Sequence, residues 1–443
     1  MQTSFTLAQL ADPETAEADK ILRACVHCGF CTATCPTYVL LGNELDSPRG
    51  RIYLIKDMLE NDRPATAEVA KHIDRCLSCL ACMTTCPSGV HYMHLVDHAR
   101  DHIERTYERP LGDRLMRNLL ARVLPDARLF RIAAAAGMLG KPFAPLLKAL
   151  GLTRVAAMLK LTPARLAPPN DPGRKVYPAQ GQRRARVALH AGCINPVLSP
   201  STNESAIRVL NRAGIEVVIA EGDGCCGSLV HHMGREDQAL GQARSLIDSW
   251  TREIEGEGLD AILITVSGCG TVVKDYGHLL RTDSAYAAKA ERVSSLARDV
   301  SEYLYTLDLA PSAGAKSLTV AYHSACSLQH GQKVTRAPKD LLCKLHFVVK
   351  DVPEGHLCCG SAGTYNILQP ELADRLRDRK VANIERLEPD VIAAGNIGCI
   401  TQIGAGTGIP VVHTVELIDW ATGGPVPERL RGLADGRMAQ SAG

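Results

Sequence analysis

Three features typical of nucleic-acid-binding or membrane-spanning proteins are scarce in this sequence: aromatic residues, excess charge and long apolar runs. Aromatic residues make up only 4% of the 443 residues, too few for a surface that stacks nucleic-acid bases. The formal net charge is +2, whereas a nucleic-acid binder needs a strongly basic face. Lys and Arg residues interrupt the most apolar stretch, 129–161, so it falls short of the roughly 18 apolar residues of a membrane span. We therefore predict a soluble or peripheral protein with no transmembrane helix and no nucleic-acid partner.

The sequence also lacks a secretory signal and the composition of a disordered chain. Residues 1–20 are polar and acidic, without the basic start and apolar core of a signal peptide. Hydrophobic residues make up 46% and charged residues 22%, as in globular proteins, and the length suggests about three domains. Cysteine is the exception. With no export signal, 17 cysteines predict metal or redox ligands rather than a disulfide scaffold.

Eight cysteines form two copies of one motif near the start of the chain. Residues 25–36 read CVHCGFCTATCP and residues 76–87 read CLSCLACMTTCP, and both match C-x2-C-x2-C-x3-C-P, the run of two-cluster bacterial ferredoxins. In that motif three thiolates come from one tight loop, and the fourth cysteine binds the other cluster. The predicted ligands of two [4Fe–4S] clusters are therefore Cys25, Cys28, Cys31 and Cys86 for cluster 1, and Cys76, Cys79, Cys82 and Cys35 for cluster 2.

Zinc binding is the alternative interpretation of these eight cysteines. A pair of zinc knuckles would use two C-x2-C pairs for one tetrahedral site, which two complete four-cysteine runs fit poorly.

Between the runs, Arg49 and Arg51 follow Pro48 at the start of an expected helix. These arginines either offset cluster charge or contact a partner, or they lie at a solvated helix start.

The C-terminal half is predicted to be a tandem duplication. A Cys, Cys-Cys-Gly, Cys series occurs there twice, with offsets of 133 (326 − 193 and 358 − 225) and 130 (399 − 269). In each copy short β-rich runs alternate with helix-like stretches, which predicts parallel sheets flanked by helices. The cysteines follow the strands, at the sheet edge where open α/β sheets place their sites. The expected strands are 187–190, 215–220, 261–266, 318–322, 347–352 and 391–394, and the expected helices include 236–253 and 370–387.

Each copy offers four thiols that could bind a further cluster or zinc. Thiol redox chemistry and simple packing are the alternatives. His190 and His323, each three residues before a cysteine, are interpreted as core residues, with metal ligation or proton donation as alternatives. Cys343 has no counterpart and is predicted to be a buried core thiol. The candidate thiols are Cys193, Cys225, Cys226 and Cys269 in the first copy and Cys326, Cys358, Cys359 and Cys399 in the second.

The predicted fold is multidomain: an α-helical two-[4Fe–4S] ferredoxin-type domain over 1–104, a helical bridge and linker over 105–182, and two α/β cysteine-rich domains over 183–312 and 313–443. Residues 163–182 are Pro- and Gly-rich and are interpreted as the linker. Residues 127–166 carry seven basic residues and no acidic one. This segment either contacts an anionic membrane or is a helical bridge packed on the second half.

No catalytic residues are predicted. The sequence contains no Ser-His-Asp elbow, P-loop or H-E-x-x-H, and residues 404–408 lack the strand–GxGxxG–helix context of a nucleotide site. His231-His232 is interpreted as a feature of a helix entry rather than a metal site.

The cysteine motifs and their flanks resemble the iron–sulfur subunit of glycolate oxidase. The resemblance lies in ILRACVHCGFCTATCPTYVLLG, ELDSPRGRIYLIKDMLE and RCLSCLACMTTCPSGV. The two C-terminal units resemble the CCG cysteine-rich domains of heterodisulfide reductase subunits and of the anaerobic glycerol-3-phosphate dehydrogenase iron–sulfur subunit. Both units lack the last cysteine of the heterodisulfide reductase pattern, because Val272 and Gln402 occupy its position.

The resemblance implies a non-catalytic electron-transfer subunit of a flavin-dependent glycolate and D-lactate dehydrogenase complex. Flavoprotein subunits would bind FAD and oxidise the 2-hydroxy acid, and this chain would pass electrons towards quinone at the cytoplasmic face of the inner membrane. Two alternatives remain: the equivalent subunit of a lactate or glycerol-3-phosphate dehydrogenase, and a thiol-disulfide reductase that uses the CCG units.

Overall fold

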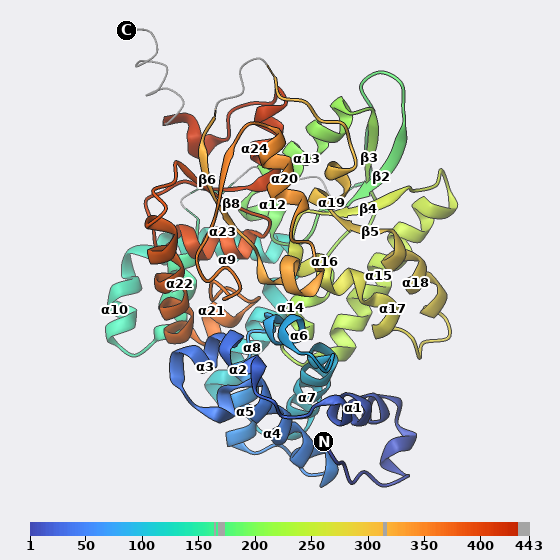
Figure 1. The fold of residues 1–443 in the computed structure, drawn as a ribbon, viewed down its shortest axis with the longest axis vertical. Helices are drawn as coiled ribbons and strands as arrows, with labels where there is room; N and C mark the ends of the chain where they lie inside the picture. Colours follow the sequence, from blue (N-terminus) through green and yellow to red (C-terminus); the bar gives the residue numbers. More distant parts are fainter. Residues whose placement is uncertain (164, 167–172, 313–316, 433–443) are drawn as a thin grey trace.

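The computed structural model describes residues 1–163, 165–166, 173–312 and 317–432. A helical N-terminal region lies below two α/β units in Figure 1, and a set of bridging helices connects them. The order of these parts along the chain is the predicted one, and the predicted fold class is confirmed.

The N-terminal region consists of short helices around a core of its own. Asp12 caps the first long helix by accepting a hydrogen bond from the Thr15 amide, and Ser47 caps another by accepting from Gly50. The helices of this region turn their apolar faces inward and bury residues such as Leu22, Ile55 and Leu95. The elements are η1 (Gln9–Ala11), α1 (Pro13–Ala24), α2 (Phe30–Thr34), α3 (Pro36–Leu41), η2 (Glu44–Asp46), α4 (Pro48–Glu60), α5 (Ala67–Asp74), α6 (Ala81–Thr85) and α7 (Tyr92–Thr106).

The bridge that follows is helical, as predicted. Only a few of its residues, among them Leu120, Ala134 and Ala156, are fully buried. Its elements are α8 (Leu111–Val123), α9 (Ala127–Gly140), η3 (Lys141–Phe143), α10 (Ala144–Ala149) and α11 (Thr153–Leu161).

The first α/β unit contains a sheet of order β1-β3-β2-β4-β5. All pairings are parallel except that of β1 with β3. The strands are β1 (Lys175–Tyr177), β2 (Ala185–Leu189), β3 (Ile215–Ile219), β4 (Ala261–Ile264) and β5 (Ala297–Asp299). The helices are α12 (Asn195–Leu198), α13 (Pro200–Arg212), α14 (Ser228–His231), α15 (Glu236–Glu255), α16 (Ser267–Lys274), α17 (Tyr276–Leu279), α18 (Ala287–Leu296) and α19 (Val300–Tyr305).

The second unit repeats this plan with a parallel sheet of order β7-β6-β8-β9. Its strands are β6 (Thr319–His323), β7 (Val348–Asp351), β8 (Val391–Ala394) and β9 (Val411–His413). Its helical elements are η4 (Ser327–Gly331), α20 (Ala337–Lys344), α21 (Tyr365–Leu368), α22 (Pro370–Glu385), α23 (Ile397–Gly404), α24 (Thr414–Ala421) and η5 (Glu428–Leu430).

The two units share one hydrophobic core. Val187 and Leu263 of the first sheet belong to the same buried cluster as Val320 and Val391 of the second. An ionic contact adds to it, because Arg208 and Arg212 of α13 both bind the buried Asp419 of α24, each at 2.6 Å. The two sets of cysteine loops are therefore held in a fixed relation to each other.

Each predicted strand is present, with ends that differ by a few residues. Two predictions are wrong. The predicted linker 163–182, of which residues 164 and 167–172 lie outside the described residues, contains β1, a three-residue strand too short to leave a pattern. Cys343 is exposed rather than buried, because it lies on the outer face of α20 while Leu341 and Leu342 face the core.

Candidate thiol-rich metal centres

The two N-terminal cysteine loops wrap around small cavities. Tight turns make this possible: Gly29 has φ +85°, and Ser78 and Leu80 adopt positive φ in the second loop. The structure places both fourth cysteines beside the opposite loop. A cavity of about 30 Å³ is lined by Cys25, Cys28, Cys31, Cys82 and Cys86, and one of about 20 Å³ by Cys35, Cys76, Cys79 and Cys82.

A buried arginine lies beside the second of these cavities. Arg51 is 1% exposed and donates a hydrogen bond to the Cys35 sulfur at 3.7 Å. It also donates to the His72 carbonyl and the Thr37 hydroxyl, and its guanidinium lies 3.6 Å from the Asp46 carboxylate. Of the two interpretations of this arginine, the solvated helix start is wrong. A fixed positive charge faces the thiols, as an anionic thiolate cluster requires.

Burial dominates the electrostatics of these thiols. It raises the pKa of Cys79 and Cys82, and neighbouring thiols raise both further. The same two causes raise the pKa of Cys31 to about 11. Without a cation these thiols would stay protonated, and a metal that replaces the protons removes that cost. The donor set therefore fits an iron–sulfur cluster in each cavity.

In the first α/β unit, four cysteines meet at the carboxyl ends of the strands. Cys193 follows β2, Cys225 and Cys226 follow β3, and Cys269 lies on α16 after β4. The Cys193 thiol donates to the Cys225 sulfur at 3.7 Å. The ligand atoms of His190, Cys226 and Cys269 lie within 4.8 Å of one another.

Hydrogen bonds between these thiols set their acidity. The bond from Cys193 is the largest factor that lowers the pKa of Cys225, to about 3, and a bond from Cys226 lowers the pKa of Cys269 to about 6. Burial opposes the charged form of His190, but the Asp223 carboxylate outweighs it and raises the pKa of His190 to about 10. The group can therefore supply thiolates to a metal at neutral pH.

The second unit has the same thiol geometry. Cys326 donates to the Cys358 sulfur at 3.7 Å, and the ligand atoms of His323, Cys359 and Cys399 lie within 4.8 Å of one another. The bond from Cys326 lowers the pKa of Cys358, and the bond from Cys359 lowers the pKa of Cys399 to about 6. The structure thus gathers the four candidate cysteines of each copy, together with one histidine.

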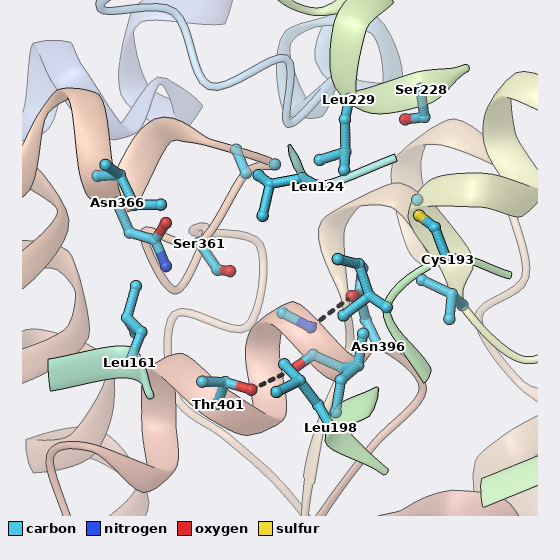
Figure 2. Close-up of a pocket in the computed structure, with 18 of the residues that line it drawn as sticks. Leu124, Leu161, Cys193, Leu198, Ser228, Leu229, Ser361, Asn366, Asn396 and Thr401 are labelled. Atoms are coloured by element: carbon cyan, nitrogen blue, oxygen red, sulfur yellow. Dashed lines mark hydrogen bonds between the residues drawn. The ribbon is translucent and has the colours of Figure 1, made fainter. Parts of the chain in front are cut away.

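The eight thiols of the two units line one cavity of about 310 Å³ between the units and the bridge. Figure 2 shows part of this lining, with Cys193 as the labelled thiol. Cys193 and Ser228 of the first unit lie on one side in this view, and Ser361 and Asn366 of the second lie on the other. Most of the lining is apolar, and Leu124 and Leu161 of the bridge contribute to it. Both thiol groups therefore face one largely apolar cavity.

The second N-terminal cavity adjoins the second unit. Cys79 and Ala81 belong to the same buried cluster as Cys358 and Cys399, and the Thr84 hydroxyl lies 2.7 Å from His330 Nδ1. The thiols predicted for cluster 2 therefore lie close to the thiols of the second unit.

Three residues near these centres have no signal in the cysteine motifs. The Asp223 carboxylate is hydrogen-bonded to the His190 ring, and Lys380 lies buried near the thiols of the second unit. Trp250 packs edge-on against His190, with the ring centroids 5.6 Å apart. A comparison of the two copies could have singled out Asp223, two residues before Cys225. The copies differ at this position, since the second has His356 there. Lys380 and Trp250 come from helices far along the chain, and only the fold brings them to the site.

His231-His232 connects the first unit to the N-terminal region. His231 ends the short helix α14, and its Nε2 lies 3.3 Å from the Asp97 carboxylate of α7. Burial opposes its charged form, but Asp97 outweighs it and raises the pKa of His231. This pair forms an ionic contact between two parts of the molecule.

The bridge carries most of the exposed apolar surface. Ten of the 17 large hydrophobic side chains exposed among the described residues lie between positions 111 and 152. We call these ten the bridge surface: Leu111, Leu115, Leu119, Leu129, Ile132, Leu139, Phe143, Leu146, Leu150 and Leu152. Exposed Arg and Lys side chains lie among them. No helix in the described parts of the chain is both long and apolar enough to cross a bilayer.

Two family models match the chain. The model described as "4Fe-4S dicluster domain" matches residues 21–90, which hold the eight N-terminal cysteines. The model described as "Cysteine-rich domain" matches twice, at 187–274 and 320–404, and so confirms the tandem duplication.

Known proteins match over most of the length. The chain is 44% identical over 421 residues to the "Glycolate oxidase iron-sulfur subunit" of Escherichia coli (strain K12), covering 95% of this chain and 99% of that one. It is 30% identical to the "Probable glycolate oxidase iron-sulfur subunit" of Bacillus subtilis (strain 168), covering 90% and 94%. It is 26% identical to "Lactate utilization protein A" of Bacillus licheniformis, over 53% of this chain and 99% of that one. A solved structure of a hypothetical protein from Helicobacter pylori shares the fold, with a TM-score of 0.52, 10% identity, and coverage of 96% of this chain and 75% of that one.

Proposed function

Since the chain belongs to the family of glycolate oxidase iron–sulfur subunits, we propose that it is the electron-transfer subunit of a flavin-dependent glycolate dehydrogenase complex that also oxidises D-lactate. Electrons leave a 2-hydroxy acid on a flavoprotein subunit and pass through this chain towards quinone. The observation that carries the proposal is the pair of neighbouring thiol-lined cavities, one of which lies against a further thiol group.

Two [4Fe–4S] clusters supply one-electron carriers, which divide the electron pair of a flavin into single steps. Cys25, Cys28, Cys31 and Cys86 hold the first cluster, and Cys76, Cys79, Cys82 and Cys35 hold the second. Arg51 holds a positive charge against Cys35, and the Tyr92 hydroxyl donates to Cys76 at 3.9 Å. These groups orient and partly neutralise the thiolates from within the protein.

The four thiols of each α/β unit hold a further metal centre, either an iron–sulfur cluster or zinc. Buried thiolates with an imidazole nitrogen are donors that both prefer. The buried sulfur pairs at 3.7 Å support the proposal, since the described residues offer these thiols only one another, a histidine and backbone groups as polar partners.

The substrate oxidation belongs to the partner subunits. FAD binds there, and this chain contributes a docking face and the route for electrons. A lactate or glycerol-3-phosphate dehydrogenase would use the same chain architecture, so the flavoprotein that co-purifies decides the substrate.

Peripheral attachment to the cytoplasmic face of the inner membrane completes the proposal. The bridge surface offers exposed apolar side chains such as Ile132, 66% exposed, and Leu139, 81% exposed. Residues 127–166 add seven basic residues and no acidic one, which complements an anionic lipid surface. An anionic membrane is therefore the occupant that its charge and apolarity favour.

Vesicle binding tests the attachment. The wild-type chain should sediment with phosphatidylglycerol-containing vesicles and much less with phosphatidylcholine alone. Leu139→Glu together with Ile132→Glu should weaken binding at least about tenfold, because two side chains lose apolar burial. Leu7→Glu, at an equally exposed leucine outside the bridge surface, should leave it unchanged. Unchanged binding of the double variant would contradict the proposal, and so would loss of flavoprotein binding without loss of vesicle binding.

A thiol-disulfide reductase is the second candidate function. The cavity between two thiol groups favours it, together with the low pKa of Cys225. Disulfide-reductase assays on Cys225→Ser and Cys358→Ser distinguish the two. A loss of disulfide reduction in either variant with intact glycolate oxidation would establish the reductase.

Anaerobic co-purification tests the main proposal. The isolated chain should show iron–sulfur absorbance but no glycolate oxidation, and activity should return with the flavoprotein subunits. Glycolate oxidation by the purified chain alone would contradict it.

A further inference from the structure

His190 occupies a specific and unusual position in the first unit. Its side chain is 1% exposed, and its Nδ1 lies 2.9 Å from Oδ1 of Asp223, which is also 1% exposed. The same oxygen accepts the amide hydrogen of Ala191 at 3.2 Å, so the carboxylate is fixed at the end of β2. The backbone therefore holds Asp223, and Asp223 holds the imidazole.

The second ring nitrogen of His190 is left without a partner. Nε2 is buried and faces the Cys269 sulfur without a hydrogen bond of normal geometry. Because the Asp223 carboxylate accepts a hydrogen bond from Nδ1–H, Nε2 is the ring nitrogen left for a metal, which would displace the proton that Nε2 carries in the charged ring. The remaining polar atoms near it are the sulfurs of Cys226 and Cys269, within the 4.8 Å group. A buried ring nitrogen that faces sulfurs and makes no hydrogen bond has an unmet bonding requirement.

A metal would meet that requirement. Histidines that bind metals characteristically give their other ring nitrogen to a carboxylate, which fixes the tautomer and the ring orientation. Asp223 and His190 have this arrangement, and the thiols next to them are the soft donors of zinc and iron–sulfur centres. Trp250 packs edge-on against the ring of His190, with the ring centroids 5.6 Å apart.

The second unit provides an internal comparison. Both ring nitrogens of His323 are buried and without a hydrogen-bond partner among the described residues. The position equivalent to Asp223 (223 + 133) is His356, which is half-buried and whose carbonyl lies 3.3 Å from His330 Nε2. A buried amine, Lys380, lies near these thiols and donates to the Glu354 carbonyl at 2.8 Å. In this unit no carboxylate fixes the tautomer of the histidine.

From this comparison we propose that His190 is a nitrogen donor, through Nε2, to the metal centre of the first unit, next to Cys226 and Cys269, and that Asp223 is its positioning residue. The inference rests on the proposed metal centre of the first unit. Binding the metal displaces the remaining thiol protons and the Nε2 proton of His190 to solvent, and no electron is transferred. The two centres then differ: one has a fixed nitrogen donor, and the other has a histidine with no such restraint.

Metal analysis of the anaerobically purified full chain gives the first test. Iron and zinc are counted in the wild type and in His190→Ala, Asp223→Asn and Asp223→Ala. The matched control is His323→Ala, at the same motif position in the second unit. His190→Ala should lose the metal of the first centre, or lose it to a chelator far more readily. The Asp223 variants should retain the metal but bind it about 10–100-fold more weakly.

Spectroscopy gives the second test, independent of activity. For an iron–sulfur centre, pulsed paramagnetic resonance should detect a ¹⁴N coupling that His190→Ala removes and His323→Ala keeps. For a zinc centre, the cobalt-substituted protein should show a visible-band shift in His190→Ala only. The roughly eight irons of the N-terminal clusters should remain in every variant, which shows that the chain has folded.

Two results would overturn the inference. One is a His190→Ala protein with wild-type metal content, chelator resistance and spectra. The other is a wild-type protein with about eight irons and no further metal. The second result removes the centre but leaves the electron-transfer role of the N-terminal clusters standing, so the two failures are distinguishable.

Discussion

The two α/β units share their thiol geometry but differ in what surrounds it. In both, the sulfurs of one cysteine pair lie 3.7 Å apart, and the ligand atoms of one histidine and two cysteines lie within 4.8 Å of one another. Around the thiols, the first unit has a buried carboxylate, Asp223, whereas the second has a buried amine, Lys380. The duplication therefore preserved the ligands and changed the electrostatic field, so the two centres are not expected to be equivalent.

The two units also meet the N-terminal region differently. The first unit does so through several ionic pairs, among them His231 with Asp97 and Arg281 with Glu14. The second does so through apolar packing that includes Cys79 and Cys358, together with the contact between Thr84 and His330. This packing suggests that electrons from cluster 2 reach the second unit first.

Removal of a thiol of cluster 2 should have the largest effect and should distinguish the two units. Cys79→Ser should lower the iron of the N-terminal clusters from about eight to about four atoms per chain and abolish electron transfer to an artificial quinone. It should disturb the spectrum of the second centre and leave that of the first unchanged, because Cys79 shares a buried cluster with cysteines of the second unit. Equal disturbance of both centres would contradict the comparison.

Removal of one thiol from each unit comes next. Cys225→Ser should eliminate the metal of the first unit only, and Cys358→Ser that of the second only, since each thiol pairs within its own unit. Metal analysis of the two variants and of the double variant checks this. Loss of both centres in a single variant would show one shared centre in the cavity between the units.

The buried cation beside the cluster thiols predicts a large stability effect. Arg51→Met should cost about 3–5 kcal/mol of the free energy of unfolding, because it leaves the buried Asp46 with one cation fewer. Arg49→Met is the control: this arginine is 32% exposed and pairs with Glu44, so it should cost no more than about 1 kcal/mol. Denaturant unfolding of both variants measures the difference, and equal losses would argue against a special role for Arg51.

The ionic contact of the first unit predicts a smaller, pH-dependent effect. The pKa of His231 is raised in the folded chain, so the stability it contributes is complete below about pH 6.5 and is lost as the pH rises through the raised value. Asp275 and Glu236 add to the same attraction. His231→Ala should flatten the fall of the melting temperature above that pH. The corresponding residue of the second unit is Thr364, and Thr364→Ala should leave the pH profile unchanged.

The sequence predicted the parts of the structure that repeat or have fixed spacing. The C-x2-C-x2-C motifs and the offset of 133 residues led to the helical N-terminal region and the two α/β units, because thiol ligation and parallel sheets impose regular patterns. The strand β1, with three residues, left no such pattern. The exposure of Cys343 depends on which face of α20 packs against the core. The apolar character of a single cysteine could not predict that face.

Within the site, the ligand types were predictable and their surroundings were not. Arg51 was ambiguous in the sequence because a helix start is usually solvated, and only packing against Thr37 and His72 shows it to be buried. The apolar cavity between the units depends on how the bridge helices fold over both sheets, which no local pattern encodes.

Iron, sulfide and paramagnetic resonance measurements on the anaerobically purified chain test the central claim most directly. We expect at least about eight irons per chain and, after dithionite reduction, the signals of two interacting [4Fe–4S] clusters. A colourless protein that binds only zinc and gives no signal after reduction would contradict it.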